Sequence, residues 1–395
     1  MNELLQILIP AIIAFACASW IHPYVLKMAK TKNIVDNPDA RKLQRVPIPV
    51  LGGLIVVFGI LTGIMTLNLF GEPYDLFPVF AAIFVILIIG LIDDMISLSP
   101  KVRFVVEIIL VLHLIYTTGY QINDFRGLWG IGEISNYISV PLTVFACVGI
   151  INAINLIDGV DGYSSGYTMT SCILFGIMFY NLGNIQMVAL AAIVAVSLAP
   201  FFLHNVFGKS SKMFIGDAGT LSLGVIFSVF VINIISSDPS TISAKENLGI
   251  IPFTLAVLCV PVFDTLRVMS ARIARGKSPF SPDKTHLHHL FIELGYSHIG
   301  TTMSIIGINL FVVLCWFFAY KWGLSIDMQL YIVVALGFFV TFIFYPFVKK
   351  QIRKESGIYY GFRRIAKHTH AERKGFWLFA QEWADKSASE EVRNL

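Results

Sequence analysis

Long apolar stretches dominate the sequence and set what it can fold into. A helix needs about 20 mainly apolar residues to cross the hydrocarbon core of a bilayer. Eleven stretches meet or approach that length, near 4–29, 50–70, 77–92, 103–120, 138–156, 165–182, 186–207, 219–236, 249–269, 303–320 and 328–347. A spanning helix satisfies its own backbone hydrogen bonds, which lipid cannot do. The sequence therefore predicts an all-α polytopic membrane protein with about eleven transmembrane helices.

The composition is typical of a chain that is embedded in a lipid bilayer. Hydrophobic residues make up 56% and charged residues 14%, whereas soluble domains carry about 25% charged residues. A net charge of +4 gives no reason to expect a nucleic-acid partner. The five cysteines all lie in apolar stretches without CxxC spacing, so we interpret them as small buried hydrophobic residues.

The distribution of Lys and Arg predicts the orientation. Of the 29 basic residues, 26 fall in alternate loops and in the C-terminal tail, and three (Arg126, Lys245 and Lys321) fall in the opposite loops. By the positive-inside rule the basic side is cytoplasmic, which places the N-terminus outside and the C-terminus in the cytoplasm. We divide the chain into a transmembrane catalytic domain, residues 1–348, and a cytoplasmic polar tail, residues 349–395. Phe376, Phe379 and Trp383 have the spacing of an amphipathic helix that lies on the membrane surface.

Polar groups cluster on that same predicted cytoplasmic side. Ionisable residues at a membrane boundary are costly and are therefore candidates for function. Asp93-Asp94 suits a divalent cation with a phosphate, or a general base whose neighbour raises its pKa. The segment from Asn152 through Asn155 and Asp158 to Asp161 suits recognition of a sugar or base, or a metal. A plain acidic helix end and a solvated loop are the alternatives.

Two further clusters complete the set. Phe214-Ile-Gly-Asp217-Ala-Gly219 lets backbone N–H groups and a carboxylate approach a metal–diphosphate together, although Gly-Asp at a span end also occurs in intramembrane aspartyl proteases. The cluster His286, His288 and His289 lies in a basic loop, which indicates a phosphate-rich substrate. A zinc site there has no supporting Cys or HExxH motif.

In combination, these motifs resemble the polyprenyl-phosphate N-acetylhexosamine-1-phosphate transferases, whose distant relative is phospho-MurNAc-pentapeptide translocase. The resemblance covers roughly residues 36–300. It rests on five motifs in order: Asp36-Asn-Pro through Gly52-Gly53, Asp93-Asp94 through Lys101, Asn152–Gly162, Phe214–Gly219, and Asp283 through His289. Two positions depart from the family pattern: Gln44 replaces a histidine, and Glu107 stands where relatives often have glutamine.

The resemblance implies a reaction and a set of roles. N-acetylhexosamine-1-phosphate, most simply GlcNAc-1-phosphate, would pass from a UDP-sugar to undecaprenyl phosphate with Mg²⁺, or Mn²⁺, as cofactor, and UMP would leave. Asp93 and Asp94 would be catalytic, and Asp217 with Asp94 would bind the metal. Substrate-binding positions would be Lys42, Lys101, Asn152, Asn155, Asp158, Asp161, His286, His288 and His289.

The same resemblance implies a setting, and two alternatives stay open. The enzyme would be a multi-pass protein of the bacterial inner membrane with its active site facing the cytoplasm, and a homodimer is a conceivable assembly. One alternative is a phospho-MurNAc-pentapeptide transferase. The other is an ion-coupled transporter, whose acidic residues would bind cations near the bilayer midplane and whose sequence would show internal repeats.

The predicted orientation can be tested with reporter fusions. A reporter fused after Leu395 should be active in the cytoplasm, and one inserted near Asp238 should be exported. The measurement is paired alkaline phosphatase and fluorescence activity in cells. Cytoplasmic behaviour of the Asp238 fusion would contradict the eleven-span topology.

Overall fold

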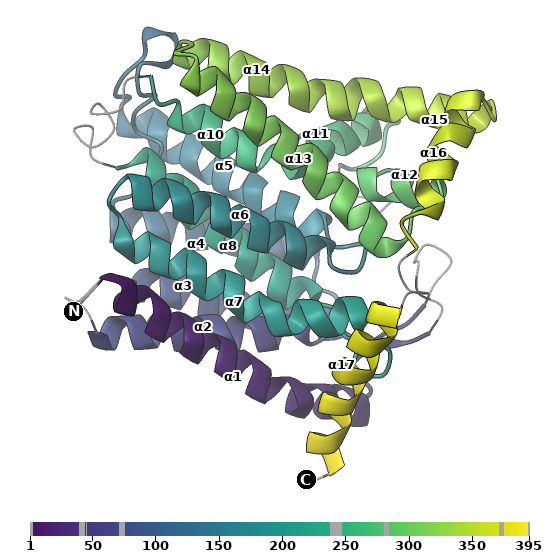
Figure 1. The fold of residues 1–395 in the computed structure, drawn as a ribbon. Helices are drawn as coiled ribbons and strands as arrows, with labels where there is room; N and C mark the ends of the chain where they lie inside the picture. The colour runs from purple at the N-terminus through teal and green to yellow at the C-terminus, as the bar shows by residue number, and fades with distance from the viewer. Residues whose placement is uncertain are drawn as a thin grey trace. The chain divides into compact units, whose positions relative to one another are not determined.

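The computed structural model describes residues 3–38, 44, 46–70, 76–237, 247–279, 284–370 and 375–393, and nearly all of its regular structure is helical (Figure 1). The elements of the first part of the chain are α1 (Glu3–Thr31), β1 (Val35–Asp36), β2 (Ile48–Pro49), α2 (Gly52–Phe70), α3 (Phe77–Ile96), α4 (Pro100–Thr118), η1 (Leu128–Gly130), α5 (Asn136–Leu156), α6 (Tyr163–Asn181), α7 (Ile185–Phe207) and α8 (Gly216–Ile235). Those that follow are α10 (Ile250–Val257), α11 (Cys259–Ile273), α12 (Leu287–Glu293), α13 (His298–Lys321), α14 (Ile326–Phe338), a π-helix (Phe339–Phe344), α15 (Tyr345–Arg353), α16 (Gly357–Lys367) and α17 (Gly375–Arg393). The fold class predicted from the sequence is confirmed.

All eleven predicted apolar segments are helical, but they differ in how well they suit a membrane span. Eight described helices are long and apolar enough to cross a bilayer, and α10 with α11 would make a ninth if the bent pair is one span. Helix α4 falls short because it carries Lys101, Arg103 and Glu107, and α6 falls short because its first half is rich in Ser, Thr and Tyr. The exact number of spans and their orientation stay predictions.

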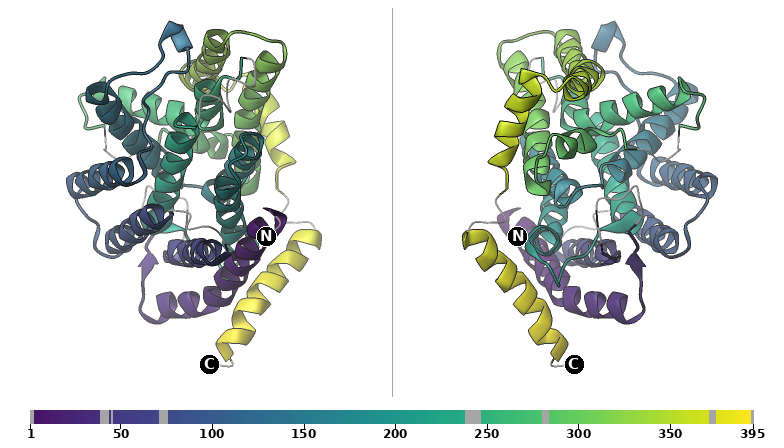
Figure 2. Two further views of the ribbon diagram at one scale, coloured as in Figure 1. Left: turned by 90° about the vertical axis from the view of Figure 1, so that its left-hand side faces the viewer. Right: turned by 90° about the vertical axis from the view of Figure 1, so that its right-hand side faces the viewer.

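The helices form two compact units. One comprises residues 1–119, 150–230 and 371–395, and the other comprises residues 120–149 and 231–370, so two of the four boundaries fall inside helices, in α5 and α8. In the first unit α1 packs against α2 and α7, α6 packs against α7, and α17 packs against α1 and α7 (Figures 1 and 2). The short strands β1 and β2 pair antiparallel, with Val35 opposite Pro49 and Asp36 opposite Ile48. The predicted division at residue 348 stays a prediction.

Close backbone approaches hold α8 within the first unit. A Cβ atom added to Gly53 of α2 would lie 2.2 Å from the backbone nitrogen of Gly219, and one added to Gly90 of α3 would lie 2.4 Å from Cα of Ala218. Both contacts fall on the first turn of α8, where only the absence of side chains lets three helices meet. Ala218 and Leu221 are fully buried there. Glycine at these positions thus fixes where α8 begins.

The second unit contains a break in one apolar helix that the sequence does not predict. The predicted span 249–269 is two helices, α10 and α11, bent by 70° at Leu258. The amide of Asn309 in α13 compensates the break: its oxygen accepts a hydrogen bond from the Val260 nitrogen at 3.0 Å, and its nitrogen donates to the Val257 carbonyl at 2.9 Å. Irregular backbone at membrane depth persists where protein groups satisfy it in this way.

The close contact at Gly90 predicts a sharp packing requirement. The substitution Gly90→Ala should destabilise the protein by about 1–3 kcal/mol or more, because the added methyl group meets backbone rather than a movable side chain. Gly307→Ala is the matched control, since a Cβ atom at helical Gly307 meets nothing within 4 Å. Thermal unfolding in detergent measures both, and equal stability of the two variants would refute the packing argument.

Candidate active site

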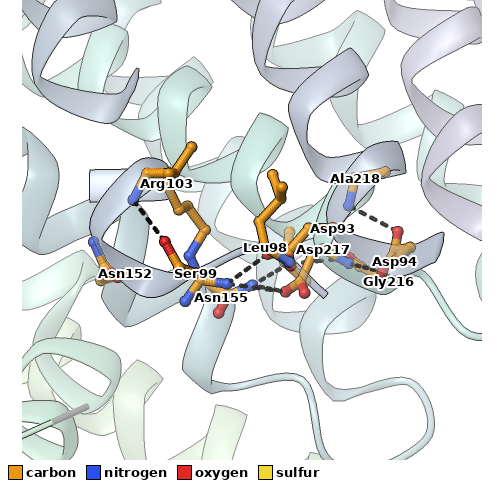
Figure 3. Close-up of polar contacts among 12 residues, drawn as sticks. Asp93, Asp94, Leu98, Ser99, Arg103, Asn152, Asn155, Gly216, Asp217 and Ala218 are labelled. Atoms are coloured by element: carbon orange, nitrogen blue, oxygen red, sulfur yellow. Dashed lines mark hydrogen bonds and ion pairs between the residues drawn. The ribbon is translucent and has the colours of Figure 1, made fainter. Parts of the chain in front are cut away.

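Asp94, at the end of α3, caps the beginning of α8. Its Oδ1 accepts a hydrogen bond from the Asp217 nitrogen at 2.7 Å, and its Oδ2 accepts one from the Ala218 nitrogen at 3.1 Å (Figure 3). These N–H groups belong to the first turn of a helix and have no partner within it, so a carboxylate there is favoured. Gly216 has φ +69°, and a Cβ atom would come within 2.5 Å of Oδ2 of Asp94. The Gly-Asp motif therefore seats one carboxylate on the backbone that carries the next.

Asp93 is buried beside Asp94 and binds the beginning of α4. Its Oδ1 accepts from the Leu98 nitrogen at 2.6 Å, and its Oδ2 accepts from Nη1 of Arg103 at 3.1 Å. Ser99 begins α4 as its N-cap and Pro100 follows at the first helical position, which is a common pattern for a helix start. The turn Ser97–Ser99 thereby points Arg103 back toward Asp93.

Arg103 lies between two carboxylates from different helices. The same Nη1 atom is 3.7 Å from Oδ1 of Asp217, whose side chain is one-third exposed. Asn155 of α5 donates to that Oδ1 at 2.5 Å and to Oγ1 of Thr220 at 2.8 Å. Helices α3, α4, α5 and α8 thus converge on Asp217 at one group of helix ends, all within the first unit (Figure 3).

Glu107 extends this network into the buried part of α4. It lies one turn after Arg103, with its Oε1 3.9 Å from Nε of Arg103, and its Oε2 accepts a hydrogen bond from Asn152 at 2.6 Å. The side chain is completely buried, and Oε1 has no hydrogen-bond partner among the described residues. Asn152 and Asn155 therefore each hold one carboxylate, one from α4 and one from α8.

The two acidic residues after α5 have separate partners. Asp158 accepts a hydrogen bond from Oγ of Ser164 at 2.9 Å, and Asp161 accepts one from Nζ of Lys212 at 2.5 Å. Burial raises the pKa of Asp158 to about 7, against the opposing effect of the Ser164 hydrogen bond. Asp161 instead ties the α5–α6 turn to the segment that leads to Asp217.

The remaining predicted positions of the first unit carry less information. Lys101 is exposed in the first turn of α4. Lys42 lies outside the described residues. Gln44 donates a hydrogen bond to Oδ2 of Asp36 at 2.7 Å, so the residue that departs from the family pattern is engaged within the same loop.

The histidine cluster belongs to the second unit and has its own acidic centre. Nδ1 of His286 lies 3.0 Å from Oδ2 of Asp264, and Arg267 approaches the other oxygen of Asp264 at 2.6 Å. Burial and the neighbouring His289 and His286 hold the pKa of His288 well below its usual value, so this ring is neutral at pH 7. Asp264 thus orders His286 and the start of α12 through the Leu287 nitrogen, at 3.1 Å.

The network has the donor chemistry of a magnesium site without being a preformed cage. Among the described residues, no three His, Cys, Asp or Glu side chains form a group that could hold a metal ion. Mg²⁺ is commonly bound through one or two carboxylates plus substrate phosphates and water, so a cage is not required. The Arg103 guanidinium between Asp93 and Asp217 shows that this position favours positive charge. The carboxylates present therefore fit such an ion.

Several residues of the network were not predicted as site residues. Arg103 is one of them, although its i, i+4 spacing to Glu107 is a signal that could have found it. Lys212 had no such local signal, because its partner Asp161 lies 51 residues away, whereas the i, i+3 spacing of Asp264 and Arg267 could have found Asp264. Sequence reasoning did identify Asp93, Asp94, Asn155 and Asp217, which the structure brings together.

Comparison with known proteins gives a consistent result. Residues 76–235, from α3 to the end of α8, match the family model described as glycosyl transferase family 4. A Bacillus subtilis (strain 168) protein named as a probable undecaprenyl-phosphate N-acetylglucosaminyl 1-phosphate transferase is 28% identical over 305 residues, which cover 77% of this chain and 82% of the relative. Proteins named undecaprenyl-phosphate alpha-N-acetylglucosaminyl 1-phosphate transferase from Yersinia pestis and Escherichia coli (strain K12) are 27% and 28% identical, each over 69% of this chain and 73% of the relative. The matched region contains the whole carboxylate network, and this part of the chain is similar to glycosyl transferase family 4.

Proposed function

We propose that this protein transfers N-acetylglucosamine-1-phosphate from UDP-N-acetylglucosamine to undecaprenyl phosphate and releases UMP. The lipid-linked sugar would start a cell-envelope glycan. The names of the relatives support the sugar-phosphate and the lipid acceptor. The UDP donor rests on the family resemblance and on the site chemistry.

One observation carries the proposal: Arg103 binds Asp93 and approaches Asp217 where four helix ends meet. Phosphoryl transfer requires the protein mainly to position the reactants and to balance charge. A phosphate on a membrane lipid can meet a soluble donor only at the end of the spans, where this network lies. Charged side chains near the membrane cost free energy, so those that are present are candidates for a functional role.

The chain's own groups have distinct tasks in this proposal. Asp93 would accept a proton from, or act on, the lipid phosphate, and Arg103 would hold a phosphate in line while remaining tethered to Asp93. Asp94 positions α8 and, with it, Asp217. Asn152 and Asn155 keep the carboxylates of Glu107 and Asp217 oriented through hydrogen bonds.

Asp217, with Asp94, would hold Mg²⁺. Three carboxylates, those of Asp93, Glu107 and Asp217, lie near the single guanidinium of Arg103, and Asp94 adds a fourth acidic group to the network, so acidic groups outnumber basic ones. When bound, the ion would neutralise developing charge on the donor diphosphate. Mn²⁺ has the same oxygen preference and is an alternative cofactor.

The remaining assignments complete the proposal. The remaining residues proposed to contact the donor are Asp158, Asp161, Lys42, Lys101, His286, His288 and His289. The active site would lie on the cytoplasmic face of the inner membrane. UDP-sugars are made in the cytoplasm and could reach it there. A homodimer is a further proposal.

The deciding experiment supplies purified protein with undecaprenyl phosphate, Mg²⁺ and individual UDP-sugars, and follows lipid-linked sugar and UMP. UDP-N-acetylglucosamine should give both products in equal amounts. If product forms only from UDP-MurNAc-pentapeptide, that compound is the donor and the proposed donor is wrong. No transfer from any UDP-sugar, together with an ion-driven flux in vesicles, would indicate a transporter instead.

The paired carboxylates should differ in what their removal costs. Asp93→Asn and Asp94→Asn should each lower kcat and kcat/KM together by orders of magnitude, with a far smaller change in UDP-sugar affinity, because Asp93 would act on the lipid phosphate and Asp94 would help to hold Mg²⁺. Asp94→Asn should also lower the free energy of unfolding by about 1 kcal/mol, because it weakens the cap of α8. Steady-state kinetics and thermal unfolding measure these effects.

Asp327→Asn is the matched control for these two variants. Asp327 lies in the first turn of α14, after the N-cap Ser325, and accepts a hydrogen bond from the Trp129 nitrogen at 2.7 Å, in the second unit. The control should cost stability without changing turnover. Full activity of both Asp93→Asn and Asp94→Asn would exclude the pair from the reaction.

The proposed metal site gives a separate prediction. Asp217→Asn keeps the side chain's size and removes its charge, so turnover should disappear at ordinary Mg²⁺ concentrations while the protein stays folded. Isothermal titration with Mg²⁺ in the presence of UDP-sugar should show binding to the unaltered protein and none to the variant. Unchanged Mg²⁺ affinity would remove Asp217 from the ligand set.

A further inference from the structure

The loop between α7 and α8 contains a backbone anion site that the reaction does not account for. The nitrogens of Lys209, Ser210 and Ser211 all donate to one oxygen, Oδ1 of Asp385 in α17, at 3.0, 2.9 and 2.9 Å. The hydroxyl of Ser211 donates to the same oxygen at 2.9 Å. Consecutive N–H groups that converge in this way form a nest, a typical binding site for an anion. Here the anion is a carboxylate from a residue 174 positions along the chain.

Helix α17 is docked on the first unit around this contact. Helical spacing puts Trp377, Ala384 and Asp385 on one face of α17. Trp377 packs on Phe207, with ring centroids 4.7 Å apart, and Ala384 is fully buried. Trp383 stacks near His204 of α7 at 6.1 Å. Asp385 is thus held in register by its neighbours and is not a loose surface charge.

An exposed apolar edge of α17, next to the docked face, fits a membrane surface. Phe376, Phe379 and Trp383 remain more than half exposed, as expected for a helix whose apolar edge meets lipid. Burial alone would raise the pKa of Asp385, but the hydrogen bonds from the 209–211 turn hold it below its ordinary value. The carboxylate is therefore ionised, and the bonds it accepts are charge-assisted.

The nest lies at the start of the segment that delivers Asp217. Beyond Ser211, Lys212 pairs with Asp161, and the Met213 carbonyl accepts a hydrogen bond from Asn205 at 2.8 Å. Gly52 and Gly53 then donate to the carbonyls of Phe214 and Ile215 at 2.9 and 2.7 Å. The chain next turns at Gly216 into Asp217. The segment 208–215 is therefore fixed at successive points, and the first of them is Asp385.

We propose that Asp385 is a positioning residue: its carboxylate fills the 209–211 nest and so clamps α17 onto the segment that places Asp217. The effect on turnover rests on the proposed function, whereas the clamp itself does not. A surface helix at the end of the chain would thus help to set the geometry of the active site.

The test combines hydrogen exchange with kinetics on the full-length protein in lipid nanodiscs. Asp385→Ala should speed amide exchange at residues 209–211 and, because the segment loosens, at Asp217 and Ala218. Turnover should fall by about tenfold to 100-fold, because small misplacements of a reacting group are costly. The Mg²⁺ concentration for half-maximal rate should rise. Asp385→Asn keeps one acceptor oxygen, so its values should lie between those of the unaltered protein and those of Asp385→Ala.

Glu382→Ala is the matched control, because it removes an exposed carboxylate from the same helix and should leave exchange and turnover unchanged. Unchanged exchange at 209–211 in Asp385→Ala would show that the carboxylate does not hold the turn. Faster exchange at 209–211 without any change at Asp217 and Ala218 would overturn the positioning role. If the unaltered protein makes no product, the proposed function fails, and exchange at Asp217 and Ala218 still decides the clamp.

Discussion

The hydrogen bonds from the first turn of α8 to Asp94 are the contact on which the site depends. They join α3 to α8 through a charge and two backbone dipoles, which is a strong combination away from water. The bond geometry needs the positive φ of Gly216 and the missing side chain of Gly90, so glycine and aspartate are required together. Without this cap, neither the position of Asp217 nor its distance from Arg103 would be defined.

Charge balance then explains the residues around the cap. A buried charge that loses its partner costs about 3–5 kcal/mol, so each carboxylate needs a donor. Arg103 serves Asp93 directly and approaches Glu107 and Asp217, while Asn152 and Asn155 supply neutral hydrogen bonds. Carboxamides satisfy carboxylates without cancelling their charge. The network therefore combines four acidic side chains with one guanidinium, and a site that binds a divalent cation beside phosphates needs such oxygen ligands.

The sequence predicts which residues share a membrane face but not which of them touch. Hydropathy located the long apolar helices, and the charge distribution placed Asp93, Asp94, Asn155 and Asp217 on one side, where the structure indeed joins them. The break at Leu258 was missed because Asn309, which compensates it, lies 49 residues beyond Val260 in the chain. The role of Asp94 as a helix cap and the partnership of Asp385 with residues 209–211 were missed for the same reason. Pairings across such separations leave no period or spacing in a single sequence.

The position of the site at helix ends follows from the cost of polar groups in lipid. Asp93 and Asn155 lie in the last turns of α3 and α5, and Arg103 and Asp217 lie in the first turns of α4 and α8. Helix ends already carry unsatisfied backbone donors and acceptors, so polar side chains there gain partners that mid-helix positions lack. Each carboxylate of the network that accepts a backbone hydrogen bond accepts it at a helix start or in the turn just before one. The polar side chains that would be costly within lipid are therefore the same side chains that satisfy the helix ends. A reactive site at the membrane boundary avoids that cost and supplies those hydrogen bonds.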